Sequence, residues 1–244
     1  MAFPHLRMAR RPVRSRVLVF HRVPVEAATR MLPDGLRARV VQGSAVAVLC
    51  YTWLGSLAHA LLPGGRGSTH HLSYRIAAER DEGPTTWVAR RETSSRLGAR
   101  WNETILRREH GRSSFRLEKD AFSLKLTVES ARGEELYLHV ELADRTGALF
   151  SLPEQVRQFL DQAGEVRPHD VLAPEADAID ARNAFAPEPL HVFELRSAFL
   201  DEHLSGTAVV DGAWRLVPRR SQPAREVGAR PVPAVVPGTG LPAV

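Results

Sequence analysis

The sequence contains little cysteine and little lysine, and each shortage narrows what the protein can do. Its 244 residues include one cysteine, Cys50, and among its 33 basic residues only Lys119 and Lys125 are lysines. A single cysteine excludes an intramolecular disulfide framework and a multi-cysteine zinc site. Because arginine keeps its proton and is no nucleophile, Schiff-base chemistry in this chain has only the two lysines as candidates.

Long apolar runs and the common catalytic motifs are also missing. No stretch approaches the roughly 18 apolar residues that a membrane-spanning helix needs, so we expect a soluble protein with no membrane partner. The Arg10-Arg11 pair precedes an apolar run too short for an export signal, which leaves the cytoplasm as the expected location. The absence of a phosphate-binding glycine loop, His-Glu-x-x-His and Gly-x-Ser-x-Gly removes the usual signatures of nucleotide enzymes, zinc proteases and α/β-hydrolases. We therefore expect no cofactor and no metal.

The formal charge of +5 and the pI of about 10.1 come from the two ends of the chain. Residues 1–22 hold six arginines and no acidic residue, and residues 215–244 hold five arginines and one glutamate. The intervening body is therefore mildly acidic, whereas a nucleic-acid-binding domain carries its basic residues on the folded body. A nucleic-acid partner is disfavoured on this ground.

Period-two alternation dominates the body and predicts a mainly β (α+β) protein. Phe122, Leu124, Leu126 and Val128 alternate with polar residues, and a second alternating run covers 136–142. Further strands are expected at 16–21, 36–42, 44–52, 70–79, 85–91, 103–109, 113–119 and 190–196. So many strands favour a barrel or a sandwich. Its expected core includes Leu32, Leu36, Val46, Val48, Leu124, Leu126, Leu138 and Val140.

Two short helices interrupt the strands. Apolar residues at helical spacing predict a helix over 152–162, with Ser151 and Glu154 as a capping box. A shorter helix over 25–31 ends at Pro33 and Gly35. Composition then divides the chain into three parts, which are a basic extension at 1–14, a single domain at 15–219 and a flexible Pro-rich tail at 220–244.

One segment carries a resemblance to a known family. Val-Pro-Val-Glu-Ala at 23–27 leads into Met-Leu-Pro-Asp-Gly-Leu at 31–36, and Gly-Ser-Ala-Val-Ala-Val follows at 43–48. This pattern resembles the opening of the acetoacetate decarboxylase-like superfamily, in particular its DUF2071 (YqjF-like) branch. The resemblance implies a cone-like antiparallel β-barrel closed around a small cavity, and it extends over most of residues 16–219.

The catalytic lysine of the decarboxylases has no counterpart at the matching turn. That turn reads Leu-Gly-Ala-Arg-Trp at 97–101, so Arg100 stands where the family has an imine-forming lysine. His71 stands about where the DUF2071 branch has a glutamate, and Arg75 matches the arginine of that strand. The resemblance therefore implies the scaffold of the family without its Schiff-base chemistry.

The sequence nominates seven residues for a ligand site in such a barrel. We expect His71, Glu92 and His139 to supply acid/base chemistry, because each lies on a predicted strand. The ligand-binding candidates are Arg75, Arg91, Arg100 and Trp101. His70 and His71 point to opposite faces of a strand, so the pair is not expected to hold one metal ion.

Two classes of function remain open on this scaffold. The first is a barrel that binds a small organic acid or a related metabolite through its carboxylate, with a lyase, cyclase or isomerase reaction that forms no imine. The second is a non-catalytic ligand-binding or accessory protein, and a nucleic-acid accessory protein acting through the arginine-rich ends is a distant third. A buried titratable pair inside the cavity favours catalysis. The oligomeric state stays open.

Overall fold

The structure is a computed structural model, and it describes six segments of the chain: 13–55, 68–95, 110–144, 147–162, 185–204 and 206–218. Its strands are β1 (Val13–Val23), β2 (Arg37–Ala38), β3 (Val40–Val41), β4 (Ser44–Leu54), β5 (Thr69–Arg80), β6 (Gly83–Thr93), β7 (His110–Arg112), β8 (Ser114–Lys119), β9 (Ser123–Ser130), β10 (Gly133–Leu142), β11 (Phe185–Ser197) and β12 (Val209–Pro218). The helices are α1 (Val25–Arg30), α4 (Pro153–Gln162) and α5 (Ala198–Leu204).

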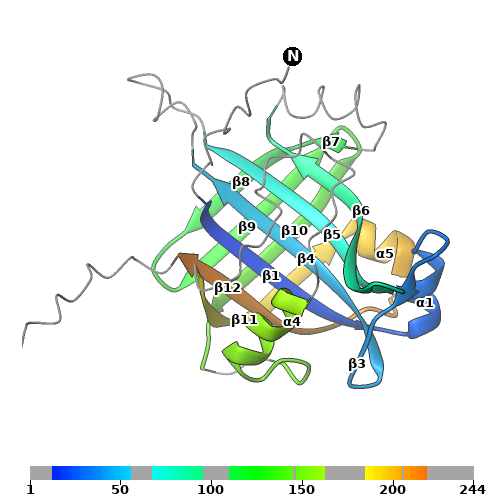
Figure 1. The fold of residues 1–244 in the computed structure, drawn as a ribbon. Coiled ribbons are helices and arrows are strands. Elements are labelled where there is room, and N and C mark those ends of the chain that lie inside the picture. The colour runs from blue at the N-terminus through cyan, green and yellow to red at the C-terminus, as the bar shows by residue number, and fades with distance from the viewer. Residues whose placement is uncertain are drawn as a thin grey trace, which may run out of the picture.

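The strands form one sheet that curls into a nearly closed barrel (Figure 1). Its strand order is β7-β6-β5-β4-β1-β12-β11-β10-β9-β8, with β2 beside β5 and β3 beside β4. Only Ser113 separates β7 from β8 in the chain, so the two ends of this order are joined covalently. The expected mainly β barrel is confirmed, with one departure from an all-antiparallel sheet, because β6 and β7 pair in parallel.

Both faces of the sheet are apolar over part of the barrel. Inward-facing side chains such as Val19, Leu49 and Leu138 form the larger core cluster, which also receives Phe199 of α5 and Ala28 of α1. Figure 1 shows α1 and α5 at the same end of the barrel. The inner face is therefore sealed at that end by helices.

A second core cluster lies on the outer face of β1, β4 and β12. Phe20 packs edge-on against Phe150 and against Phe159 of α4, with ring centroids 4.8 and 5.9 Å apart. Cys50 belongs to this cluster and is buried. Because α4 covers this face, β1 and β4 are buried on both sides, as the continuous apolar run of residues 45–51 requires.

Six of the eight expected core residues are buried, and two are not. Val46 and Val48 are buried on the outer face, and the four named residues of β9 and β10 are buried on the inner face. Leu32 and Leu36 lie in the bend between α1 and β2 and are only half-buried, although Leu32 packs against the inner core cluster. Phe122 is 70% exposed, because β9 begins one residue later.

Helix α4 confirms the expected helix and corrects its cap. Gln155, at the third position of the helix, accepts hydrogen bonds from the backbone N–H groups of Ser151 (2.8 Å) and Leu152 (3.0 Å). Pro153 occupies the first helical position, where its missing N–H costs nothing. The reciprocal cap is thus made by Gln155 and not by Glu154.

Strand β12 and helix α5 were not expected from the sequence. In β12, Phe20 of β1 lies opposite Gly212 and His21 lies opposite Val210, so Asp211 is an extra residue in the ladder. This bulge breaks the period-two pattern that identifies a strand. The expected strand at 103–109 and most of the expected terminal extensions lie outside the described residues.

Candidate functional site

A bulge in β6 decides which of its charged side chains enter the barrel. Tyr74 of β5 lies opposite Arg90, and the next residue, Arg75, lies opposite Val88, which leaves Ala89 as an extra residue. Tyr74 belongs to the inner core, and directly opposed side chains of an antiparallel pair share a face. Arg90 therefore points inward. Glu92, two residues later, also points inward.

Arg90 bridges two buried carboxylates across the interior. Its Nε lies 2.8 Å from Oε1 of Glu92, and its Nη2 lies 2.9 Å from Oε1 of Glu135. The Glu92 side chain is 1% exposed, that of Glu135 is 5% exposed and that of Arg90 is 14% exposed. Since β6 and β10 are not neighbours in the sheet, this ion pair crosses the barrel. We call Arg90, Glu92 and Glu135 the inner cluster.

A second bulge turns Glu135 inward. In β10, Glu134 lies opposite Glu129 and Leu136 lies opposite Val128, so Glu135 has no partner residue on β9. Its Oε1 accepts a hydrogen bond from Ser130 Oγ at 2.5 Å as well as the Arg90 contact. No described residue donates a hydrogen bond to its Oε2. This oxygen is not among the fully buried side-chain atoms that lack a hydrogen-bond partner. Within the described segments, Oε2 is the carboxylate oxygen of the inner cluster for which no hydrogen-bond donor is found.

Glu92 is held more tightly than Glu135. Its Oε2 accepts a hydrogen bond from Ser113 Oγ at 2.7 Å, and Oε1 receives Arg90 Nε. Gly111 of β7 lies opposite Glu92, and a Cβ atom at Gly111 would collide with the Glu92 carboxylate. The glycine thus leaves room for the carboxylate, and both oxygens of Glu92 are occupied by protein donors.

Tyr74 adds a neutral phenol beside the inner cluster. Ser197 Oγ donates a hydrogen bond to the Tyr74 hydroxyl at 3.1 Å, and the Phe199 ring stacks on the tyrosine ring at 4.3 Å. Burial raises the pKa of Tyr74 to about 12, with the carboxylates of Glu135 and Glu92 adding to the rise and Ser197 and Arg90 opposing it. Tyr74 therefore keeps its proton at neutral pH and can donate it in a hydrogen bond.

His70 closes another part of the interior. Its Nδ1 lies 2.8 Å from the Tyr51 hydroxyl, and its ring stacks between Trp53 of β4 and Phe115 of β8 at 6.0 and 5.7 Å. Burial lowers the pKa of His70, so the ring is neutral at neutral pH. His71 faces the other side of β5, as the sequence analysis expected for adjacent strand residues.

His21 is a buried polar side chain that the sequence did not single out. It lies opposite Ala47 of the inner core and is 1% exposed. Neither ring nitrogen has a hydrogen-bond partner among the described residues. Burial lowers the pKa of His21 to about 4, although nearby backbone groups of Ala47 and Val19 offset part of the effect. The imidazole is thus a neutral polar group in an apolar wall.

The expected site residues do not gather in one place. Glu92 lies in the inner cluster, but Arg75, Arg91 and His71 lie on the outer face of β5 and β6, where Arg75 Nε donates to Ser73 Oγ at 2.8 Å. His139 lies on the outer face of β10, 3.3 Å from Glu141 and stacked on Phe193. Arg100 and Trp101 lie outside the described residues.

The inward-facing polar residues of this region that sequence reasoning missed are Arg90, Glu135 and Tyr74. Arg90 and Glu92 have the i, i+2 spacing of one strand face, which is a usable signal. Glu135 carries no such signal, because the alternation of 136–142 assigns it to the outer face and only the bulge reverses this. Tyr74 lies in a stretch of β5 that is buried on both faces and mixes polar with apolar residues, so alternation does not single it out.

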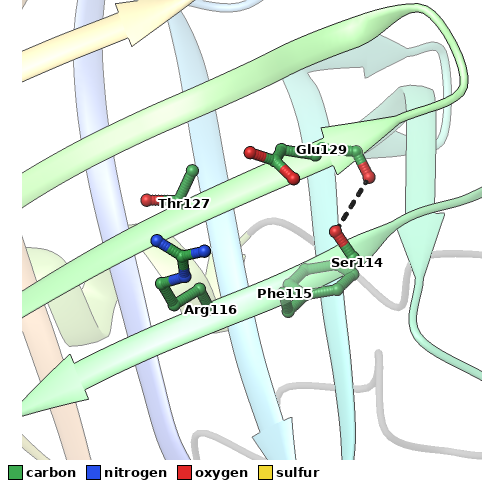
Figure 2. Close-up of a pocket in the computed structure, with 5 residues that line it drawn as sticks. All are labelled: Ser114, Phe115, Arg116, Thr127 and Glu129. Atoms are coloured by element: carbon green, nitrogen blue, oxygen red, sulfur yellow. Dashed lines mark hydrogen bonds between the residues drawn. The ribbon is translucent and has the colours of Figure 1, made fainter.

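A pocket of about 310 Å³ lies between β8 and β9. Figure 2 shows Arg116 and Ser114 of β8 beside Thr127 and Glu129 of β9. Thr127 and Glu129 flank the inward-facing Val128, so they face outward. The pocket is therefore a surface feature and is not the barrel interior.

Within the described segments no group of three or more His, Cys, Asp or Glu side chains is arranged to hold a metal ion. No helix in the same part of the chain is long and apolar enough to cross a membrane.

Comparison with known proteins identifies the fold. No protein-family model and no curated protein matches the chain. Among solved structures, the acetoacetate decarboxylase of Legionella pneumophila has a TM-score of 0.51 at 8% identity, covering 86% of this chain and 84% of that one. The enduracididine biosynthesis enzyme MppR, in complex with the condensation product of pyruvate and imidazole 4-carboxaldehyde, has a TM-score of 0.51 at 14% identity, covering 87% of each chain. The protein thus has the fold of acetoacetate decarboxylase-like enzymes.

Proposed function

We propose that the protein is an enzyme that binds a small carbonyl-bearing organic acid inside the barrel and transfers a proton at the carbon next to the carbonyl. The reaction is of the lyase or isomerase type and forms no imine. The observation that carries the proposal is the inner cluster, in which an arginine bridges two carboxylates across the barrel beside a neutral tyrosine. A buried titratable pair of this kind is typical of acid/base sites.

The geometry supports a different role for each side chain. Glu135 accepts the substrate proton at Oε2, the oxygen that makes no bond to a described residue. Tyr74 donates a hydrogen bond to the carbonyl oxygen and stabilises the negative charge that develops there as the proton leaves. Arg90 orients Glu135, and Glu92 orients Arg90, so both are positioning residues.

The proposed assignment follows from the partners of the two carboxylates. Each oxygen of Glu92 already accepts a hydrogen bond from a protein group, and a general base works best through an oxygen that no protein donor holds. Glu135 meets this requirement with Oε2.

The experiment is deuterium exchange at the methyl group of pyruvate and loss of CO2 from acetoacetate, both followed by proton NMR in D2O. General-base catalysis contributes about 10²- to 10⁴-fold, so Glu135→Gln should lower the rate by about 100-fold or more. Tyr74→Phe should lower it by about tenfold or more, as expected for an oxyanion donor. The matched control is Glu134→Gln, which changes the neighbouring exposed residue that pairs with Arg196.

The outcomes separate the two classes of function. A wild-type rate equal to that of Glu135→Gln and of buffer contradicts the enzymatic proposal. Binding of an oxo acid without any exchange favours the alternative, a non-catalytic ligand-binding protein on the same scaffold. Affinity for nucleic acid that falls steeply with salt would instead favour the third class.

A further inference from the structure

The start of helix α5 holds Tyr74 from two sides. Ser197 ends β11, where it lies opposite Leu136 of the inner core, and α5 begins at the next residue. Its Oγ donates to the Tyr74 hydroxyl at 3.1 Å, and the ring of Phe199 stacks on the Tyr74 ring with centroids 4.3 Å apart. Because β5 and β11 are not neighbours in the sheet, these contacts cross the barrel. They fix both the hydroxyl group and the ring plane of Tyr74.

The Ser197 hydroxyl is itself oriented by the helix. The backbone N–H of Leu200 donates to Ser197 Oγ at 3.4 Å, as at a helix N-cap. A serine hydroxyl has one hydrogen and two lone pairs. Since the hydrogen goes to Tyr74 and one lone pair meets Leu200, the direction of the hydroxyl is set at both ends. Ser197 is 3% exposed, so solvent competes little for these two bonds.

The Tyr74 hydroxyl keeps one proton of its own to donate. Its oxygen accepts from Ser197, so its proton points elsewhere, and no described residue accepts it. Tyr74 is 2% exposed, and buried hydroxyl groups normally have a hydrogen-bond partner. The charges of Glu135, Glu92 and Arg90 all act on the pKa of this phenol, which places the hydroxyl beside the inner cluster. The donor is thus held next to the carboxylate that we assign as the base.

We propose that Ser197 is a positioning residue, which directs the Tyr74 proton toward the carbonyl oxygen of the organic acid bound in the barrel. The inference rests on the proposed function and adds the group that orients its oxyanion donor. If Ser197 accepted the Tyr74 proton instead of donating its own, the phenol would have no hydrogen left for a ligand. A hydrogen bond to the phenol oxygen also makes the phenol a stronger donor, because hydrogen bonds in a chain polarise one another.

A purely structural N-cap is the alternative role of Ser197, and three substitutions separate the two. Glycine is almost as good an N-cap as serine and alanine is much worse, yet both remove the hydroxyl from Tyr74. Threonine keeps the hydroxyl for both roles. The positioning role therefore groups Ser197→Gly with Ser197→Ala, whereas a capping role alone groups Ser197→Gly with the wild type.

Deuterium exchange into pyruvate gives the kinetic measurement. Loss of one hydrogen bond that acts in the transition state should lower kcat by about threefold to tenfold in both Ser197→Ala and Ser197→Gly, with KM unchanged. Ser197→Thr should keep most of the wild-type rate. The matched control is Thr207→Val, at the other end of α5, which removes a hydroxyl that donates to the Leu204 carbonyl. Its rate should equal that of the wild type.

The phenol itself gives a measurement that does not depend on activity. The chain has three tyrosines, so incorporation of 3-fluorotyrosine gives three ¹⁹F NMR signals, and the spectrum of Tyr74→Phe assigns one of them. Ser197 opposes the raised pKa of Tyr74, so this signal should titrate at higher pH in Ser197→Gly than in the wild type. The other two signals should titrate alike in both proteins. Addition of pyruvate should move the Tyr74 signal in the wild type and move it less in Ser197→Gly.

Two results would overturn the inference. One is a Tyr74 signal that titrates and responds to pyruvate alike in the wild type and in Ser197→Gly. The other is a slow Ser197→Ala beside a Ser197→Gly as fast as the wild type, which is the pattern of a cap alone.

Failure of the proposed function looks different from failure of this inference. Exchange that depends on Tyr74 but is indifferent to Ser197→Gly removes the positioning role and keeps the enzyme. A wild-type protein without exchange activity, in which pyruvate still moves the Tyr74 signal and Ser197→Gly weakens that response, supports the positioning role and removes the enzymatic proposal.

Discussion

Two arginine–carboxylate clusters lie on opposite faces of the barrel wall, and they connect different parts of the chain. One is formed by Arg22 and Asp211, and the other is the inner cluster. On the outer face the Asp211 carboxylate is buried and lies 3.1 Å from Arg22 Nε. It also accepts hydrogen bonds from the backbone N–H groups of Ala148 and Leu149, at 3.2 and 2.8 Å. A Cβ atom at Gly147 would collide with the backbone of Asp211, so this segment lies directly on the strand. The Asp211 cluster fastens one segment of chain to β12.

The inner cluster does something else, because it joins two strands that are not neighbours in the sheet and leaves Oε2 of Glu135 without a donor among the described residues. Both carboxylate oxygens of Asp211 accept hydrogen bonds from backbone donors that would otherwise be unsatisfied, which is a structural use of a buried charge. In Glu135, the described donors contact only Oε1. The contrast indicates that the number of partners, and not burial alone, distinguishes a structural carboxylate from a candidate base.

The largest expected effect is on stability, from Arg90→Ala. Removal of one partner from a buried ion pair costs about 3–5 kcal/mol, and here it leaves two carboxylates facing each other's charge. Urea denaturation measures the free energy of unfolding. Replacing all three members of the inner cluster by leucine should restore most of that loss and abolish exchange activity, since an apolar triad is often as stable as an ionic one. A loss below about 1 kcal/mol in Arg90→Ala would show that the cluster is not buried in solution.

The next effect concerns pH and the unpartnered His21. Its pKa is lowered from 6.5 to about 4, so the unfolded chain binds a proton between these values that the folded chain does not. Stability is therefore full above pH 6.5 and falls as the pH drops toward 4, by about 3 kcal/mol for this group.

Denaturation at several pH values in this window checks the prediction against a variant. His21→Leu should flatten the dependence and cost little at pH 7, because it also removes two unsatisfied ring nitrogens. The exposed His203→Gln serves as the control and should keep the wild-type slope. An identical slope in His21→Leu would assign the pH dependence to other groups, such as His70, whose pKa is also lowered.

A smaller loss is expected for Asp211→Ala, together with unchanged chemistry. Unsatisfied buried N–H groups cost about 1–3 kcal/mol, and Arg22 is half-exposed and can turn to solvent, so we expect a loss of about 2 kcal/mol. Exchange activity per folded molecule should equal that of the wild type. Loss of activity in a folded Asp211→Ala variant would erase the distinction between the two clusters.

The smallest expected effect is no change in mass after treatment with acetoacetate and borohydride. Arg100 stands at the turn where the resembling family has its imine-forming lysine, and an arginine with a pKa above about 12 forms no imine. Mass spectrometry of the intact chain checks this. A borohydride-stable adduct at Lys119 or Lys125 would restore a Schiff-base mechanism with a relocated lysine.

Local pattern was sufficient for most of the fold. Alternation in 122–128 and 136–142 predicted β9 and β10 to within one to three residues, and helical spacing predicted α4. Strand β12 and helix α5 were not predicted. The bulge at Asp211 interrupts the alternation of β12, and the seven residues of α5 are too few to show helical spacing. The fold class was accessible because burial of one face imposes a period on every regular element.

The site was harder to predict from the sequence than the fold, and residues 89–92 show the reason. From the sequence, Arg90 and Arg91 are equivalent, and one of them must face the interior. The bulge at Ala89 puts Arg90 inside together with Glu92, and it puts Arg91 outside. A bulge shifts the face of every later residue by one, and its position depends on the partner strand, which is distant in sequence.

The sequence by itself determined that the protein is a mainly β barrel with short helices, without the lysine of the resembling decarboxylases at their turn. Only the tertiary structure decided that Glu135 turns inward to meet Arg90 and that His139 and Arg75 face outward. The reason is physical: periodicity is a property of neighbouring residues, whereas the bulges and the closure of the sheet arise from contacts between strands far apart in the chain.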